Sequence, residues 1–136
     1  MTTSDFNIFL VLTPKSATHF FFENDTFRQA LERFEVHKYT VVPIINENGE
    51  YVSSISEGDL LRHIKKIDQY NLVLFEKTRI SEIEKYRSYK AININASFEE
   101  VYELILSQNF VPVVDDRNKY IGIIKRKDIL LLLNSK

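Results

Sequence analysis

The feature that most constrains this chain is a stretch that occurs twice, at residues 39–61 and again at residues 108–130. Pro43 corresponds to Pro112 and Asp59 to Asp128, at the same offset (112 − 43 and 128 − 59 both give 69) and with no gap between them. Each copy has the pattern of a strand, a turn, a second strand and a helix start. Because so short a copy buries too little surface to be stable alone, the repeat predicts two copies packed against each other.

The apolar spacing predicts the same order of elements, β-α-β-β-α, in both copies. The first copy carries a strand at 19–22, a helix at 27–37, strands at 41–45 and 51–55 around a turn at 46–49, and a helix at 59–67. The second carries a strand at 90–94, a helix that begins at 95–97, strands at 110–114 and 120–124, and a helix at 128–133. Short helices are expected ahead of each copy, at 6–12 and 80–86.

The predicted fold class is therefore α+β, with two repeats about a pseudo-twofold axis. Repeat 1 with its N-terminal helix spans residues 1–67, a connector spans 68–78, and repeat 2 spans 79–136, the whole forming one module. The second repeat is shorter between its helix and its strand, because Phe27 to Pro43 is 16 residues but Phe98 to Pro112 is 14. The two copies are thus expected to differ at that loop.

Composition excludes several kinds of function. The net charge of −1 gives no support to a small RNA- or DNA-binding protein. The chain lacks cysteine, so it has no thiolate metal site or cysteine nucleophile, and its three histidines lack metal-ligand spacing. No apolar run is long enough to span a membrane and no secretory leader precedes the first repeat, so a cytoplasmic protein without membrane association is expected.

The repeat resembles the CBS motif, and nearly the whole chain is similar to one tandem CBS pair, or Bateman module. The resemblance is carried by Val41-Val42-Pro43 with Ser56-x-x-Asp59, and by Phe110-Val111-Pro112 with Lys125-x-x-Asp128. It implies an adenosine-containing ligand in a cleft between the repeats, and a homodimer.

The chain also resembles the stand-alone CBS pairs of Gram-positive bacteria that bind cyclic di-AMP (c-di-AMP). The matching segments are Lys15 with Ala17-Thr18, Tyr39-Thr40, Asn109-Phe110-Val111 and Arg126-Lys127. One departure is Lys127, because a lysine cannot make a planar, two-pronged contact with phosphate.

The residues and the resemblance together predict two ligand sites. The first comprises Lys15, Ala17, Thr18, Tyr39, Thr40, Val41, Pro43, Lys125, Arg126, Lys127 and Asp128. The second comprises Ser56, Asp59, Lys90, Ala91 and Phe110. The first is expected to be the stronger, because the second lacks the Arg-Lys pair.

The aspartates and the basic residues of these sites can each also be explained by a role in the fold or at the surface, without a ligand. A carboxylate at a helix start can accept hydrogen bonds from ribose hydroxyls, but Ser56-x-x-Asp59 is also the pattern of a capping box. The basic residues 125–127 oppose the helix dipole, which points to a bound phosphate, but such a run can also be a solvated surface.

The sequence therefore predicts a regulatory module without catalysis or a cofactor, which binds an adenine nucleotide, in the sharpest form c-di-AMP. An AMP, ADP or ATP energy sensor and a ligand-free interaction module remain as alternatives. Since no effector domain is evident in the chain, its signal is expected to pass through an effector protein.

Overall fold

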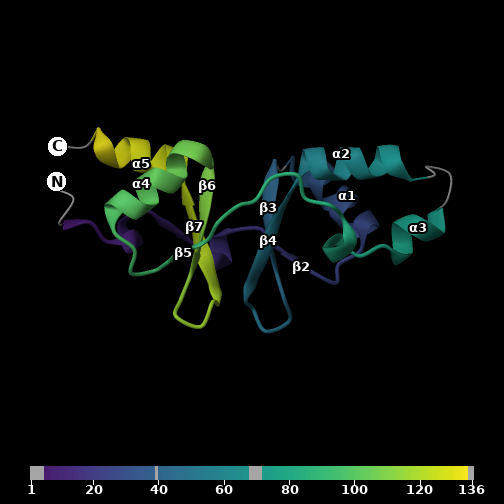
Figure 1. Cartoon of the computed structure of the whole chain (residues 1–136), viewed down its shortest axis with the longest axis horizontal. Helices are drawn as coiled ribbons and strands as arrows, with labels where there is room; N and C mark the ends of the chain where they lie inside the picture. The colour runs from purple at the N-terminus through teal and green to yellow at the C-terminus, as the bar shows by residue number, and fades with distance from the viewer. Residues whose placement is uncertain (1–4, 39, 68–71, 135–136) are drawn as a thin grey trace. The chain divides into compact units, whose positions relative to one another are not determined.

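The computed structural model describes residues 5–38, 40–67 and 72–134, with the backbone alone at 72, 74 and 75. The chain divides into two compact units, and Figure 1 labels most of their helices and strands. Unit 1 comprises Met1–His19, Gly49–Tyr51 and Tyr89–Lys136, and unit 2 comprises Phe20–Asn48 and Val52–Ser88.

Unit 2 contains a three-stranded sheet in the order β2-β3-β4. Its strands are β2 (Phe21–Phe22), β3 (Val41–Ile45) and β4 (Tyr51–Ser56), with β2 parallel to β3. Helix α1 (Phe27–His37) begins at a capping box formed by Thr26 and Gln29, and α2 (Glu57–Lys66) follows β4 directly. The core contains Phe21, Phe27, Ala30, Phe34, Val42, Ile44, Ile55, Leu60, Ile80 and Ile83.

The segment that leads from the first copy to the second is more structured than the sequence suggested. The predicted connector contains a helix, α3 (Leu72–Lys77), while residues 68–71 lie outside the described residues. The predicted helix at 80–86 is wrong, because only a 3₁₀ turn, η4 (Ile80–Glu82), forms there. The Tyr86 N–H donates to the Asp59 carboxylate instead of continuing a helix.

Unit 1 contains a four-stranded sheet in the order β1-β7-β6-β5. Its strands are β1 (Leu12–Pro14), β5 (Ile92–Asn93), β6 (Phe110–Val114) and β7 (Tyr120–Lys125). Helices α4 (Phe98–Ser107) and α5 (Arg126–Leu133) pack against β6 and β7 (Figure 1). The core contains Ile8, Val11, Ile92, Val101, Ile105, Val111, Val113, Ile124 and Ile129.

The helix predicted at residues 6–12 is wrong, because only a 3₁₀ turn forms within it and strand β1 begins at its last residue. A 3₁₀ turn, η2 (Ile8–Leu10), begins at the cap residue Asn7, and the chain then extends from Leu12 to pair antiparallel with β7. The close approach is permitted by Gly122, because a Cβ atom there would lie 2.2 Å from the carbonyl oxygen of Thr13.

The order of elements predicted for both copies is confirmed. The first copy reads β2-α1-β3-β4-α2 and the second β5-α4-β6-β7-α5, so the fold is α+β with two β-α-β-β-α repeats. The bounds of α1, β3 and β6 are those predicted, whereas α2 and α5 begin two residues earlier, at Glu57 and Arg126. Within the described part of the chain, no helix has the length and apolar character needed to cross a membrane.

Candidate functional site

The start of helix α5 carries the most distinctive chemistry of unit 1. Lys125 occupies the N-cap position, where its side chain makes no capping hydrogen bond, and Asp128 lies in the first turn. Among the described residues, none hydrogen-bonds to or forms an ion pair with the partly exposed Asp128 carboxylate. This carboxylate is therefore available to a ligand.

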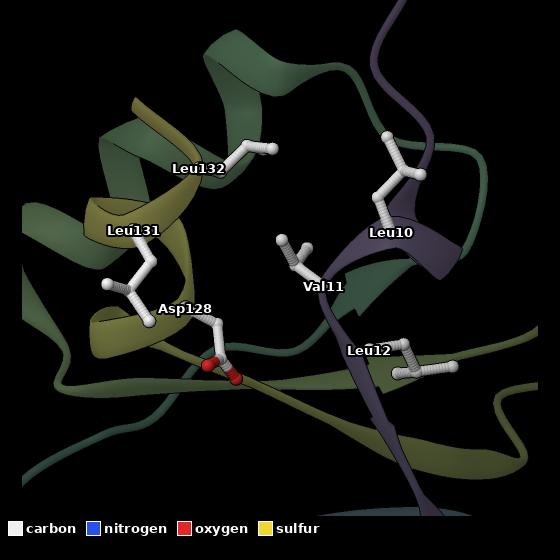
Figure 2. A pocket seen from close by; sticks show the side chains of 6 residues that line it. All are labelled: Leu10, Val11, Leu12, Asp128, Leu131 and Leu132. Atoms are coloured by element: carbon white, nitrogen blue, oxygen red, sulfur yellow. The ribbon is translucent and has the colours of Figure 1, made fainter. Parts of the chain in front are cut away.

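Asp128 borders an open hollow of about 430 Å³ in unit 1. The hollow is lined by Leu10, Val11, Leu12, Asp128, Leu131 and Leu132. Figure 2 shows the carboxylate between α5 and the segment that leads into β1, with Val11 extending toward Leu132. Its volume lies in the range of small-molecule sites, and its lining side chains are apolar apart from one acid, although more of its exposed surface is polar than apolar.

The five apolar lining residues were not predicted as part of a site. Leucine and valine at helical spacing look like core positions in a sequence, and nothing local distinguishes a wall from a core. Only the pairing of β1 with β7 brings residues 10–12 to Asp128.

Arg126 is anchored by the fold of unit 1. Its Nε donates to the carbonyl oxygen of Ile105, 2.9 Å away, and its backbone N–H donates to the carbonyl oxygen of Asn109, 3.0 Å away. One guanidinium donor thus caps the end of α4, which leaves the terminal nitrogens for other contacts. Lys125 and Lys127 are exposed and form no ion pair within the described part of the chain.

The predicted residues near the N-terminus lie toward the other end of β7. Lys15 and Ala17 belong to a 3₁₀ turn, η3 (Lys15–Ala17), that follows Pro14, the partner of Gly122 in the β1–β7 register. Lys125 ends β7 three residues after Gly122, roughly 10 Å further along the strand. The β1–β7 register therefore places Lys15 and Lys125 apart instead of bringing them together.

Thr18 has its hydrogen bonds satisfied inside unit 1. Its Oγ1 donates to the carbonyl oxygen of Lys15 at 2.8 Å and accepts from the Tyr120 hydroxyl at 2.9 Å. Burial raises the pKa of Tyr120 to about 12, although the hydrogen bond with Thr18 acts in the opposite direction. Tyr120 was missed by sequence reasoning, since a tyrosine at a strand start carries no signal of a polar partner.

In unit 2, residues of the first predicted site lie beside the start of helix α2. The Glu57 N–H donates to the carbonyl oxygen of Thr40, 2.9 Å away. Val41 begins β3, and Pro43 is buried within it. Tyr39 lies outside the described residues.

Asp59 is committed to the fold of unit 2. It is 3% exposed, and its Oδ2 accepts from the Ser56 N–H at 2.9 Å while the Ser56 hydroxyl accepts from the Asp59 N–H. The capping box proposed as the structural alternative is confirmed. The second oxygen, Oδ1, accepts from the Tyr86 N–H at 3.1 Å and lies 3.7 Å from Nη1 of Arg62.

Lys90, Ala91 and Phe110 belong to unit 1, where Gln108 connects two of them. The buried Gln108 amide accepts from the Lys90 N–H and donates to the carbonyl oxygens of Lys90 and Phe110, at 2.9, 3.1 and 3.2 Å. The neighbouring Asn109 carbonyl receives the Arg126 N–H. Within unit 1, Gln108 and Asn109 therefore link residues that the sequence had assigned to separate sites. Each predicted site also includes residues of unit 2, so both sites stay predictions.

No group of three or more acidic or histidine side chains suited to a metal ion occurs among residues 5–38, 40–67 and 72–134. His63 is the histidine with an unusual environment. Its ring meets Phe27 edge-on at 4.8 Å, and its buried Nε2 has no hydrogen-bond partner among the described residues. Burial lowers the pKa of His63, and the charge of Lys66 lowers it further.

The repeated β-α-β-β-α unit, with an aspartate three positions into the last helix of each copy, defines a tandem CBS pair. The CBS domain model matches residues 14–66 and 80–135, and the chain belongs to this family.

Solved structures of similar fold include CbpB in complex with c-di-AMP, which is 25% identical over 95% of this chain and 85% of that chain, with a TM-score of 0.84. CbpB from Streptococcus agalactiae is also 25% identical, over 98% of this chain and 82% of that chain, with a TM-score of 0.82. An uncharacterised protein of Methanocaldococcus jannaschii is 29% identical over 122 residues, which are 82% of this chain but only 44% of that relative. The chain thus spans less than half the length of this curated relative.

Proposed function

We propose that the chain is a non-catalytic regulatory module that binds an adenine nucleotide, and that this nucleotide is c-di-AMP. The observation that carries the proposal is the likeness to CbpB in complex with c-di-AMP, which extends over 95% of the chain. Residues 1–67 and 79–136 form the two repeats of this module in the proposal, joined by the linker between them.

The hollow at Asp128 supplies two of the three groups that a nucleotide needs. The apolar side chains that line it, among them Val11 and Leu132, suit the faces of a purine. The Asp128 carboxylate has two oxygens that accept hydrogen bonds, and a ribose carries the matching hydroxyl donors. In this proposal the carboxylate holds the ribose, while the apolar side chains exclude water from the base.

The third group, positive charge for the phosphates, lies at the start of α5. Lys125, Arg126 and Lys127 place three cations at the positive end of a helix dipole, which is an unfavourable position for cations. A phosphate bound there meets the cations together with the first-turn N–H groups other than that of Arg126, which already donates to Asn109. Lys15 lies nearer the start of β7, so in the proposal it serves a phosphate further from α5.

The signal of such a module is transmitted through another protein. In the proposal the chain acts as a homodimer, and an effector protein distinguishes the ligand-bound form from the ligand-free form. A ligand changes this output only through a difference in its affinity for two states of the dimer.

Calorimetry with c-di-AMP, AMP and ATP tests the proposal. We expect c-di-AMP to bind most tightly and Asp128→Asn to weaken binding about 10- to 100-fold, because a hydrogen bond to a charged group contributes about 1.5–3 kcal/mol. Glu99→Gln is the matched control, since Glu99 is an exposed acid in the first turn of α4.

Three outcomes would count against the proposal. Tighter binding of AMP or ATP would identify an energy sensor instead. Equal affinity of the Asp128→Asn and Glu99→Gln variants would remove Asp128 from the site. No binding, and no rise in melting temperature at excess ligand, would leave an interaction module without a nucleotide.

A further inference from the structure

We propose that Tyr120 is a positioning residue, whose buried hydroxyl fixes the turn that carries Lys15 so that this lysine meets a ligand phosphate. We call residues 15–18 the Lys15 turn. The inference rests on the proposed function, because Lys15 is one of the groups assigned there to a phosphate. It goes further by giving a role to a side chain that belongs to neither predicted site.

The Lys15 turn is held on strand β7 at both of its ends. At its start, Pro14 is the register partner of Gly122, where a Cβ atom would collide with the backbone of β1. At its end, Oγ1 of Thr18 accepts a hydrogen bond from the Tyr120 hydroxyl at 2.9 Å. Tyr120 and Gly122 lie two residues apart on the same strand, so β7 fixes both ends of the turn.

Two hydroxyl groups connect Tyr120 to the backbone of Lys15. Thr18 accepts from Tyr120 through Oγ1, and the same hydroxyl donates to the Lys15 carbonyl oxygen, 2.8 Å away. The Thr18 N–H donates to that carbonyl as well, at 3.0 Å. Successive hydrogen bonds of this kind strengthen one another, and water competes little for the Tyr120 hydroxyl because the side chain is 2% exposed. The backbone conformation at Lys15 therefore depends on one buried oxygen atom.

The other copy of the repeat contains the same arrangement. Tyr51 begins β4 as Tyr120 begins β7, and the two residues are separated by the repeat offset (120 − 51 = 69). The Tyr51 hydroxyl donates to the carbonyl oxygen of Tyr89 at 2.9 Å, and Tyr89 precedes Lys90, a basic residue of the second predicted site. Tyr51, Tyr89 and Lys90 all belong to unit 1. In both copies a tyrosine at the start of a strand thus holds a segment that carries a predicted ligand lysine.

Packing alone does not explain a hydroxyl at position 120. A phenylalanine would fill nearly the same space, whereas a tyrosine places a polar group in a buried position, which is unfavourable unless that group is hydrogen-bonded. The benefit of the hydroxyl is that it orders the Lys15 turn before a ligand arrives. Lys15 itself is partly exposed, and a lysine on an ordered backbone loses less conformational freedom when it binds a phosphate.

Calorimetry with c-di-AMP on a double-mutant cycle tests the inference in the full chain. Tyr120→Phe should weaken binding about 3- to 10-fold, as expected for one hydrogen bond, and Lys15→Gln should weaken it at least about 10-fold. When Lys15→Gln is already present, Tyr120→Phe should change the affinity less than about twofold, because its effect passes through Lys15. Tyr102→Phe is the matched control, since Tyr102 is an exposed tyrosine on α4, and it should leave the affinity unchanged.

Hydrogen exchange of the Thr18 amide, measured without ligand, reports on the turn itself. This amide donates to the Lys15 carbonyl oxygen. Tyr120→Phe should raise its exchange rate at least about fivefold, whereas Tyr102→Phe should leave the rate unchanged. Thr18→Val breaks the same contact from the side of the turn, so it should reproduce both losses and serves as the second variant if Tyr120→Phe does not fold.

Two results would overturn the inference. If Tyr120→Phe weakens binding by the same factor with and without Lys15→Gln, the tyrosine does not act through Lys15. If the exchange of the Thr18 amide is unchanged in Tyr120→Phe, the hydroxyl does not position the turn, whatever the affinity. If no nucleotide binds while Tyr120→Phe releases the Thr18 amide, the nucleotide proposal fails and the positioning of the Lys15 turn by Tyr120 stands.

Discussion

Replacing each of the two repeated aspartates by alanine should have very unequal consequences for stability. Asp59→Ala removes the acceptor of two backbone N–H groups, those of Ser56 and Tyr86. A hydrogen bond to a charged group contributes about 1.5–3 kcal/mol, and values at the lower end apply here because the Tyr86 N–H can be rehydrated. The half-exposed Arg62 adds under about 1 kcal/mol.

We therefore expect Asp59→Ala to lower the free energy of unfolding by about 3 kcal/mol. For a chain of this length that corresponds to a fall of about 12 °C in melting temperature. Asp128→Ala loses only a favourable interaction with the helix dipole and gains helix propensity, so the change should stay within about 0.5 kcal/mol.

Urea unfolding of the ligand-free protein, followed by far-ultraviolet circular dichroism, measures both changes. The dependence of the free energy on urea should be the same in all three proteins, so the midpoint alone moves. Equal losses for the two variants, or a loss under about 1 kcal/mol for Asp59→Ala, would refute the assignment of Asp59 to the fold.

Four further changes test other parts of the structure. Gly122→Ala should cost over about 2 kcal/mol because its Cβ would meet a backbone oxygen of β1, whereas Gly58→Ala should be neutral in the same unfolding assay. Burial lowers the pKa of His63 from 6.5, so stability should be complete above pH 6.5 and fall as the pH drops below it. His63→Leu should abolish that dependence in urea titrations. Since the pKa of Tyr120 is about 12, absorbance titration should show one tyrosine ionising late, and Tyr120→Phe should remove this phase. Lys125→Ser should raise stability by about 1 kcal/mol by supplying an N-cap hydroxyl, and should weaken nucleotide binding.

The sequence predicted the parts of the fold that depend on local signals. The polar run 24–26 marks the start of α1, and the apolar runs at Val41–Ile45 and Phe110–Val114 mark strands buried on both faces. Their repetition in the chain then gives the order of the remaining elements. Elements of this kind need no information about distant contacts.

The errors occur where distant contacts decide the structure. Residues 6–12 have helical spacing, but Leu12–Pro14 gains a partner strand more than a hundred residues away, and Gly122 makes the space for it. The predicted helix at 80–86 stops early because the Tyr86 N–H finds a carboxylate on α2. Local periodicity carries no information about either partner.

The candidate site shows the same division between residues that local signals predict and residues that distant contacts bring together. Both aspartates were visible in the sequence, and so was the difference at the N-cap, where Ser56 has a hydroxyl acceptor and Lys125 has none. A hydroxyl at that position completes a capping box and commits the third residue of the helix to it, whereas a lysine leaves the third residue without a reciprocal partner. The Asp128 carboxylate of the second copy then has no partner among the described residues, as the role proposed for it requires. The first copy instead commits Asp59 to the backbone N–H groups of Ser56 and Tyr86, and the residue at the N-cap marks this difference between the copies.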